Sequence, residues 1–130
     1  MRKPTRPLAC LGLIALACFG SPAQALGPEQ FEVHNTQDII ELCSTAPTDP
    51  LYVAAIHFCH GYLIGAYHYQ DALYKGPGIK PVVCLPTPTP TRNEGIAQYL
   101  AWAKAHPEYG KDRAVDSLSK FLAETWPCKN

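Results

Sequence analysis

The residues of this chain best suited to do chemistry are its cysteines. Cys10 and Cys18 lie in an apolar N-terminal segment, and four more are spread along the rest of the chain: Cys43, Cys59, Cys84 and Cys128. None of the spacings among these four has the close C-x-x-C form that is typical of structural zinc sites. An even number of widely spaced cysteines favours two disulfide bonds in an oxidising compartment. We therefore expect disulfides and no thiol-bound metal.

Histidines are the other candidate metal ligands, and three of the five lie in one predicted helix. His57 and His60 could share an ion, but His68 lies eleven residues beyond His57, about 16 Å along a helix axis. The three side chains cannot converge on one ion. We interpret them as surface or core histidines and predict no metal and no other cofactor.

Catalytic motifs do not accompany these residues. The chain has no G-x-S-x-G nucleophile motif and no phosphate-binding glycine loop, and its carboxylates are scattered as on solvated helix faces. No spacing argument links Ser117 to His106. We predict that the protein is not an enzyme. An uncharacterised exported hydrolase that assembles its site from distant residues stays open as an alternative.

The first 25 residues have the three zones of a secretory signal peptide. A basic start over residues 2–6 precedes an apolar run over residues 8–19, and Ala23-Gln24-Ala25 has small residues at both positions that signal peptidase recognises. The apolar run is shorter than the roughly 20 residues that a membrane-spanning helix needs. We predict cleavage near Ala25, a periplasmic location and no membrane anchor; lipid attachment at Cys18 is the weaker alternative.

Cleavage would leave residues 26–130 as a single mature domain. It would remove three basic residues and no acidic ones, leaving 8 basic against 11 acidic residues. This mildly acidic balance, without a basic cluster, argues against binding to nucleic acid or to an anionic membrane surface. A domain of this size buries a core with little stability to spare, so covalent links would matter.

Capping signals and helix breakers predict four helices. Asp49-Pro50 supplies an N-cap and a first-turn proline for the second helix, and Thr91-x-x-Glu94 has capping-box form for the third. The predicted helices are residues 35–43, 51–73, 91–105 and 112–125. The fourth helix places one set of side chains on a single side: Ala114, Leu118, Phe121, Leu122 and Thr125. The expected fold is all-α, a small disulfide-stapled bundle of about four helices.

The helix order suggests which cysteines pair. A short turn should make the third and fourth helices antiparallel and return Cys128 to Cys84, just before the third helix. By exclusion, Cys43 would pair with Cys59. Loop-closure estimates give about 4 kcal/mol for the first link and about 3 kcal/mol for the second, so losing either should be severe.

The second helix carries an unusual segment, F-C-H-G-Y-L-I-G-A over residues 58–66. Gly61 and Gly65 lie on one face, although each glycine costs a helix about 1 kcal/mol relative to alanine. We interpret these glycines, with Phe58 and Tyr62, as a helix-packing motif that lets another backbone of the same domain approach closely. Self-association into a homodimer is the alternative use of this face.

The same segment belongs to a wider pattern. After Cys43 and the segment of residues 58–66 come Cys84-Leu85-Pro86, Gln98-Tyr99-Leu100, His106-Pro107-Glu108 and Trp126-Pro127-Cys128. This pattern, over residues 38–128, resembles the Rap/Tai family of immunity proteins. Members of that family are small exported helical proteins that bind and block peptidoglycan-cleaving amidase effectors delivered by type VI secretion. The linker of residues 86–91 is more proline-rich than the family pattern.

The resemblance implies a periplasmic inhibitor whose partner is a cognate amidase effector. Because loops on a rigid scaffold often carry recognition, we predict that residues 74–81 bind the partner, with residues 86–92 as the second choice. The candidate contact residues are Tyr74, Lys75, Gly76, Gly78 and Lys80. The alternative function is an acid-stress chaperone of the HdeA type, with histidines that gain charge below about pH 6.5. The additional cysteine pair argues against that alternative.

Overall fold

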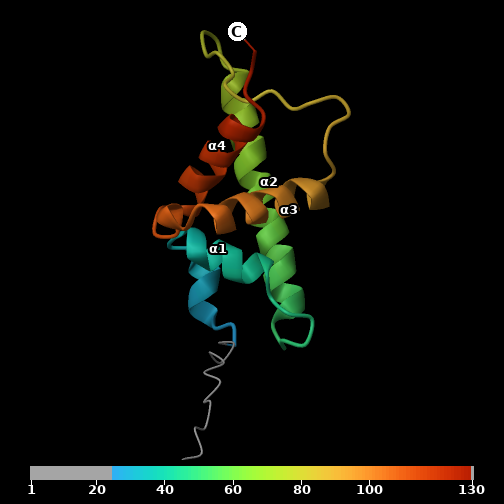
Figure 1. The fold of residues 1–130 in the computed structure, drawn as a ribbon, viewed down its shortest axis with the longest axis vertical. Helices are drawn as coiled ribbons and strands as arrows, with labels where there is room; N and C mark the ends of the chain where they lie inside the picture. Colours follow the sequence, from blue (N-terminus) through green and yellow to red (C-terminus); the bar gives the residue numbers. More distant parts are fainter. Residues whose placement is uncertain (1–24, 130) are drawn as a thin grey trace, which may run out of the picture.

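This computed structural model describes residues 25–129, which contain four α-helices and two short 3-10 helices (Figure 1). In chain order they are η1 (Pro28–Glu32), α1 (Thr36–Cys43), α2 (Tyr52–Tyr74), α3 (Arg92–Ala105), η2 (Pro107–Tyr109) and α4 (Ala114–Thr125). The all-α prediction with about four helices is confirmed. Nearly all of the predicted signal peptide, including Cys10 and Cys18, lies outside the described residues.

Side-chain caps start α1 and α3 where the sequence predicts them. Asn35 accepts a hydrogen bond from the Asp38 N–H, and the Asp38 carboxylate accepts one from the Asn35 N–H, both at 3.2 Å. At α3, the Thr91 hydroxyl oxygen accepts from the Glu94 N–H at 3.3 Å, and Glu94 accepts from the Thr91 N–H at 2.7 Å. Each capping box satisfies backbone donors that the helix itself leaves free.

The start of α2 differs from the prediction. The regular helix begins at Tyr52, with Leu51 at the N-cap and no side-chain cap bond. Asp49, the predicted cap, instead closes the preceding turn: its Oδ1 accepts from the Leu51 N–H at 2.8 Å, and its Oδ2 accepts from the Leu26 N–H at 3.3 Å. The carboxylate therefore ties the beginning of the described chain to the turn before α2.

The buried face of α4 matches the prediction except at its ends. Ala114, Leu118, Phe121 and Leu122 are buried, but Thr125 is exposed, and the next residue, Trp126, packs against the core instead. The helix also begins at Ala114 rather than Asp112. The Asp112 carbonyl accepts from the Thr36 N–H at 2.7 Å, so this residue connects α4 to α1 instead of opening the helix.

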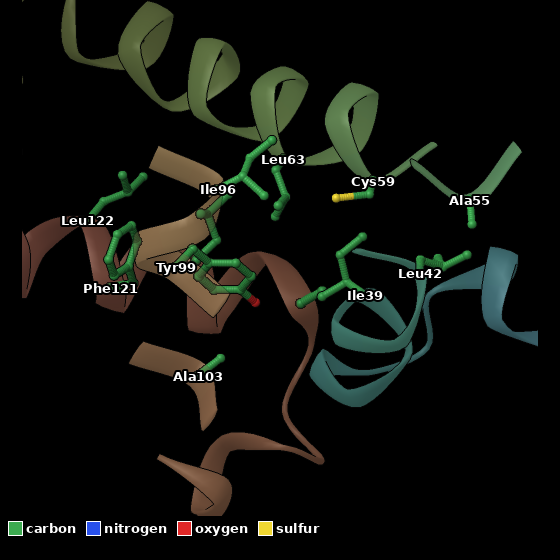
Figure 2. Packing of buried hydrophobic residues seen from close by; sticks show 12 residues of the cluster. Ile39, Leu42, Ala55, Cys59, Leu63, Ile96, Tyr99, Ala103, Phe121 and Leu122 are labelled. Atoms are coloured by element: carbon green, nitrogen blue, oxygen red, sulfur yellow. The ribbon is translucent and has the colours of Figure 1, made fainter. Parts of the chain in front are cut away.

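The core lies where α1, α3 and α4 pack against one side of α2 (Figure 2). From α2 only one narrow stripe is fully buried, formed by Ala55, Cys59 and Leu63 at a spacing of four residues. Ile39 and Leu42 of α1 meet this stripe at one end, and Ile96 of α3 meets it at the other. Much of the surface of α2 therefore remains available outside the bundle. No helix among residues 25–129 has both the length and the apolar character that crossing a membrane requires.

Both predicted disulfides are present, but the helix arrangement from which the Cys84–Cys128 pair was predicted is not observed. Cys43 is bonded to Cys59 with a Cα–Cα distance of 5.2 Å, and Cys84 to Cys128 with 4.8 Å. Figure 1 shows α4 rising obliquely beside α2 rather than lying antiparallel along α3. Cys84 and Cys128 meet because residues 82–84 pair with residues 126–128: the Cys84 N–H donates to the Trp126 carbonyl at 2.8 Å, and the Cys128 N–H donates to the Val82 carbonyl at 3.2 Å.

Candidate partner-binding site

Exposed apolar side chains gather around the segment that the sequence predicts to bind a partner. Six large apolar side chains are exposed in the described part of the chain, and four of them lie between residues 69 and 82. They are Tyr69 at 68%, Leu73 at 47%, Ile79 at 49% and Val82 at 52% exposure. In Figure 1 this segment is the end of α2 and the loop beyond it, at the top of the view. Concentrated apolar exposure of this kind is typical of protein interaction sites.

Two glycines build the turn from which these side chains project. The Gly76 N–H donates to the Leu73 carbonyl at 3.0 Å, and a Cβ at Gly76 would lie only 3.1 Å from that same oxygen. Gly78 has a φ of 78°, a backbone conformation that residues other than glycine rarely adopt. The Ile79 N–H then donates to the Gly76 carbonyl at 3.4 Å. Gly76 and Gly78 therefore shape the loop, and Ile79 beside them is exposed.

The remaining candidate residues differ in what they can offer. Lys75 donates to the Asp71 carboxylate at 2.6 Å, and this hydrogen bond raises the pKa of Lys75 above its ordinary value. Lys80 is exposed within the loop. The Tyr74 hydroxyl accepts from Gln70 Nε2 at 2.8 Å, so Tyr74 turns back along α2 instead of toward the tip of the loop. Within this set, Lys80 is the charge best placed to meet a partner.

The sequence prediction did not name the exposed apolar side chains of this segment. It named Tyr74, the lysines and the glycines of residues 74–81, but Tyr69, Leu73, Ile79 and Val82 are the side chains that carry exposed apolar surface. The available signal was the presence of Ile79 and Val82 in a stretch rich in glycine and proline, where nothing in the local pattern demands apolar residues.

The second predicted loop, residues 86–92, borders an apolar groove. The groove has a volume of about 320 Å³ and lies between this linker and the helices α2, α3 and α4. Leu63, Ile96 and Phe121 of the buried core form part of its floor. The linker thus covers a hollow in the bundle and is not only a connection between helices.

Gly61 and Gly65 do not have the predicted packing role. Both are exposed on α2, and a Cβ built on either residue would meet no atom within 4 Å. The prediction that they let another backbone of the same domain approach closely is therefore wrong: α1, α3 and α4 pack on the opposite stripe of α2. Phe58 and Tyr62 do pack against the core, and their rings stack with centroids 6.3 Å apart. Use of the glycine face in self-association remains a prediction.

The buried hydroxyl groups of the domain have a structural role. Tyr99 and Ser117 lie 2.8 Å apart through their side-chain oxygens, and Thr36 Oγ1 lies 2.9 Å from the same serine oxygen. Burial raises the pKa of Tyr99. Ser117 is bonded to hydroxyls and to the Ala114 carbonyl at 3.1 Å, and none of these groups is a base that could activate a nucleophile.

His106-Pro107-Glu108 likewise forms a structural turn between α3 and α4. His106 Nδ1 lies 2.9 Å from Glu108 Oε1, and this contact lowers the pKa of Glu108. The His106 ring packs on Trp102, and the Trp102 indole N–H donates to Glu124 of α4 at 2.9 Å. Within residues 25–129, no group of three or more histidine, cysteine or acidic side chains is arranged to hold a metal ion.

Comparison with known proteins identifies a family. Residues 35–128 match the family of Rap1a immunity proteins. The matched range begins at the cap of α1 and ends at Cys128, so it includes both disulfides, the segment of residues 69–82 and the groove. No curated protein and no solved structure is significantly similar to the chain.

Proposed function

The chain belongs to the Rap1a immunity proteins, and from this premise we propose that it is a periplasmic immunity protein that binds and inhibits a peptidoglycan amidase effector delivered by type VI secretion. Residues 1–25 would be the signal that exports it, with cleavage near Ala25 and residues 26–130 as the mature domain. The two disulfides support this location, since such bonds persist in oxidising compartments. The protein would act by occlusion and would carry out no reaction of its own.

The observation that carries this proposal is the exposed apolar surface of residues 69–82. Interfaces derive most of their affinity from a few apolar or aromatic side chains that become fully buried on binding. Tyr69, Leu73, Ile79 and Val82 are exposed in the free protein and would become buried in the complex. The segment is thus the part of the molecule that gains most from a partner.

The loop is also held in place before binding. Its first end continues α2, and its far end is anchored two residues after Val82 by the bond from Cys84 to Cys128. A loop fixed at both ends and shaped by glycines loses little conformational entropy when it docks. Such a loop suits insertion into the substrate cleft of a wall-cleaving enzyme, with Ile79 and Lys80 at its tip.

The test begins with an amidase encoded beside this gene. The purified protein should bind that amidase and suppress its cleavage of peptidoglycan, and periplasmic expression should rescue cells that produce the amidase. Ile79→Asp or Val82→Asp should weaken binding by at least about tenfold, because each places a charge in a buried contact. Val53→Asp is the matched control, since Val53 is 65% exposed at the opposite end of α2.

Two results would contradict the proposal at different levels. Failure to bind and to rescue against the neighbouring amidase would remove the amidase as the target. If Val53→Asp weakened binding as much as Ile79→Asp, the protein would still be an inhibitor of the amidase, but the loop would not be its contact surface.

A further inference from the structure

The groove beside the linker of residues 86–91 has the size and lining of a small-molecule site. Its volume of about 320 Å³ falls at the lower end of the range of about 300–1,000 Å³ that is common for such sites. Its floor consists of core side chains, including Leu63, Ile96 and Phe121, and Leu85 and Trp126 also line it. A ligand seated there would place apolar groups directly on the core of the domain.

Gly95 keeps part of this groove open. It lines the groove from α3, and a Cβ built on it would meet no atom within 4 Å. Alanine would fit this position without a clash and would favour the helix by about 1 kcal/mol. The glycine therefore leaves a space that the fold itself does not need.

The residues that line the groove carry a single permanent charge. Arg92, the first residue of α3, is the single permanently charged side chain among the residues that line it, and no carboxylate lines it. Glu94 lies two residues further along, but its carboxylate accepts the Thr91 N–H and hydroxyl, both at 2.7 Å. His68 and the hydroxyl-bearing side chains of Tyr67, Thr89 and Thr91 also line the groove. The groove thus combines an apolar floor with a cationic, hydroxyl-bearing polar part.

From this combination we propose that the groove binds a single-chain alkyl carboxylate, a medium-chain fatty acid. The alkyl chain would lie on the floor formed by the core, and the carboxylate would meet the Arg92 guanidinium, which can bind both of its oxygens at once. Charge complementarity selects this occupant: a cationic amphiphile would place its charge against Arg92, and a neutral alcohol would leave the guanidinium without a counterion.

The direct test is titration of the purified protein, with both disulfides formed, by decanoate below its micelle concentration. Calorimetry should show saturable binding of one ligand per chain, and Trp126 emission should change because Trp126 lines the groove. Decanol and decyltrimethylammonium should each bind at least about tenfold more weakly, and Arg92→Gln should weaken decanoate by about tenfold while leaving decanol unchanged. Equal binding of all three probes, or no saturable binding of decanoate, would overturn the proposal.

A pair of glycine substitutions separates the groove from the rest of the surface. Gly95→Leu should fill the groove and abolish decanoate binding. Gly61→Leu, at an exposed glycine of α2 that does not line the groove and that likewise has open space around it, should bind decanoate as the unmodified protein does. Both variants should remain folded, which circular dichroism checks. Unchanged binding by Gly95→Leu would overturn the proposal. So would sedimentation data in which the protein self-associates and Gly95→Leu makes it monomeric, because the groove would then be occupied by a second copy.

Discussion

The side-chain oxygens of Tyr99 and Ser117 lie 2.8 Å apart inside the core and join α3 to α4. Thr36 extends this contact to α1, since its Oγ1 lies 2.9 Å from the Ser117 oxygen and 2.9 Å from the Asp112 carbonyl. Three hydroxyl groups from three helices therefore form one connected polar cluster in an otherwise apolar core. In the described part of the chain, every buried side-chain nitrogen or oxygen has a hydrogen-bond partner.

The hydrogen bonds of this cluster indicate that its three side chains contribute unequally to stability. Ser117→Ala should lower the free energy of unfolding by about 2 kcal/mol, because it leaves the buried Tyr99 hydroxyl without its partner. Tyr99→Phe should lower the free energy of unfolding by only about 1 kcal/mol, because Ser117 keeps its hydrogen bonds with Thr36 and the Ala114 carbonyl. Guanidinium denaturation with the disulfides intact measures both values. A larger loss for Tyr99→Phe than for Ser117→Ala would contradict this account.

The two disulfides should differ in what their removal costs. Replacing Cys84 and Cys128 with alanine should lower the free energy of unfolding by about 4 kcal/mol, and replacing Cys43 and Cys59 by about 3 kcal/mol, because the first bond closes the longer loop. Equilibrium unfolding of the two double variants gives the comparison. The reverse order would show that native packing around the buried Cys59, and not loop length, dominates.

The exposed glycines of α2 should be replaceable with a gain in stability. Gly61→Ala and Gly65→Ala should each raise the free energy of unfolding by about 0.5–1 kcal/mol, because alanine favours the helix and meets no neighbouring atom. Thermal unfolding at several protein concentrations measures the effect. A fall in melting temperature that appears only at high concentration would instead indicate that this face is used in self-association.

The capping box of α3 should contribute to the acid sensitivity of the fold. Hydrogen bonds from the Thr91 side chain, and then from its backbone, hold the pKa of Glu94 below its ordinary value of 4.5. The ionised carboxylate therefore stabilises the folded state above pH 4.5, and this contribution is lost as the pH falls through the lowered pKa. Unfolding free energies measured across this range should decline less steeply for Glu94→Gln than for the unmodified protein. Thr91→Ala, which removes the larger of the two interactions, should also flatten the decline, and parallel curves for all three proteins would contradict the prediction.

Local sequence signals predicted the helices well, because each depends on residues only a few positions apart. Asn35 and Thr91 cap α1 and α3 through side chains that reach backbone groups three residues away. The predicted start of α2 was less accurate, because Asp49 also has a long-range partner in Leu26, which no local pattern reveals. The pairing of Cys84 with Cys128 was predicted correctly from an arrangement of α3 and α4 that the structure does not have.

The candidate sites show where sequence reasoning reached its limit. The sequence by itself determined the helical class, the cysteine framework, the family pattern and the existence of a loop after the second helix, since all of these follow from residue types and their order along the chain. Only the tertiary structure decided that Gly61 and Gly65 face away from the bundle, that Ile79 and Val82 are left exposed, and that the linker borders a groove beside Gly95. A helix has a well-defined set of faces, but the face that becomes buried is chosen by which other helices pack against it, and that choice depends on contacts between residues far apart in the chain.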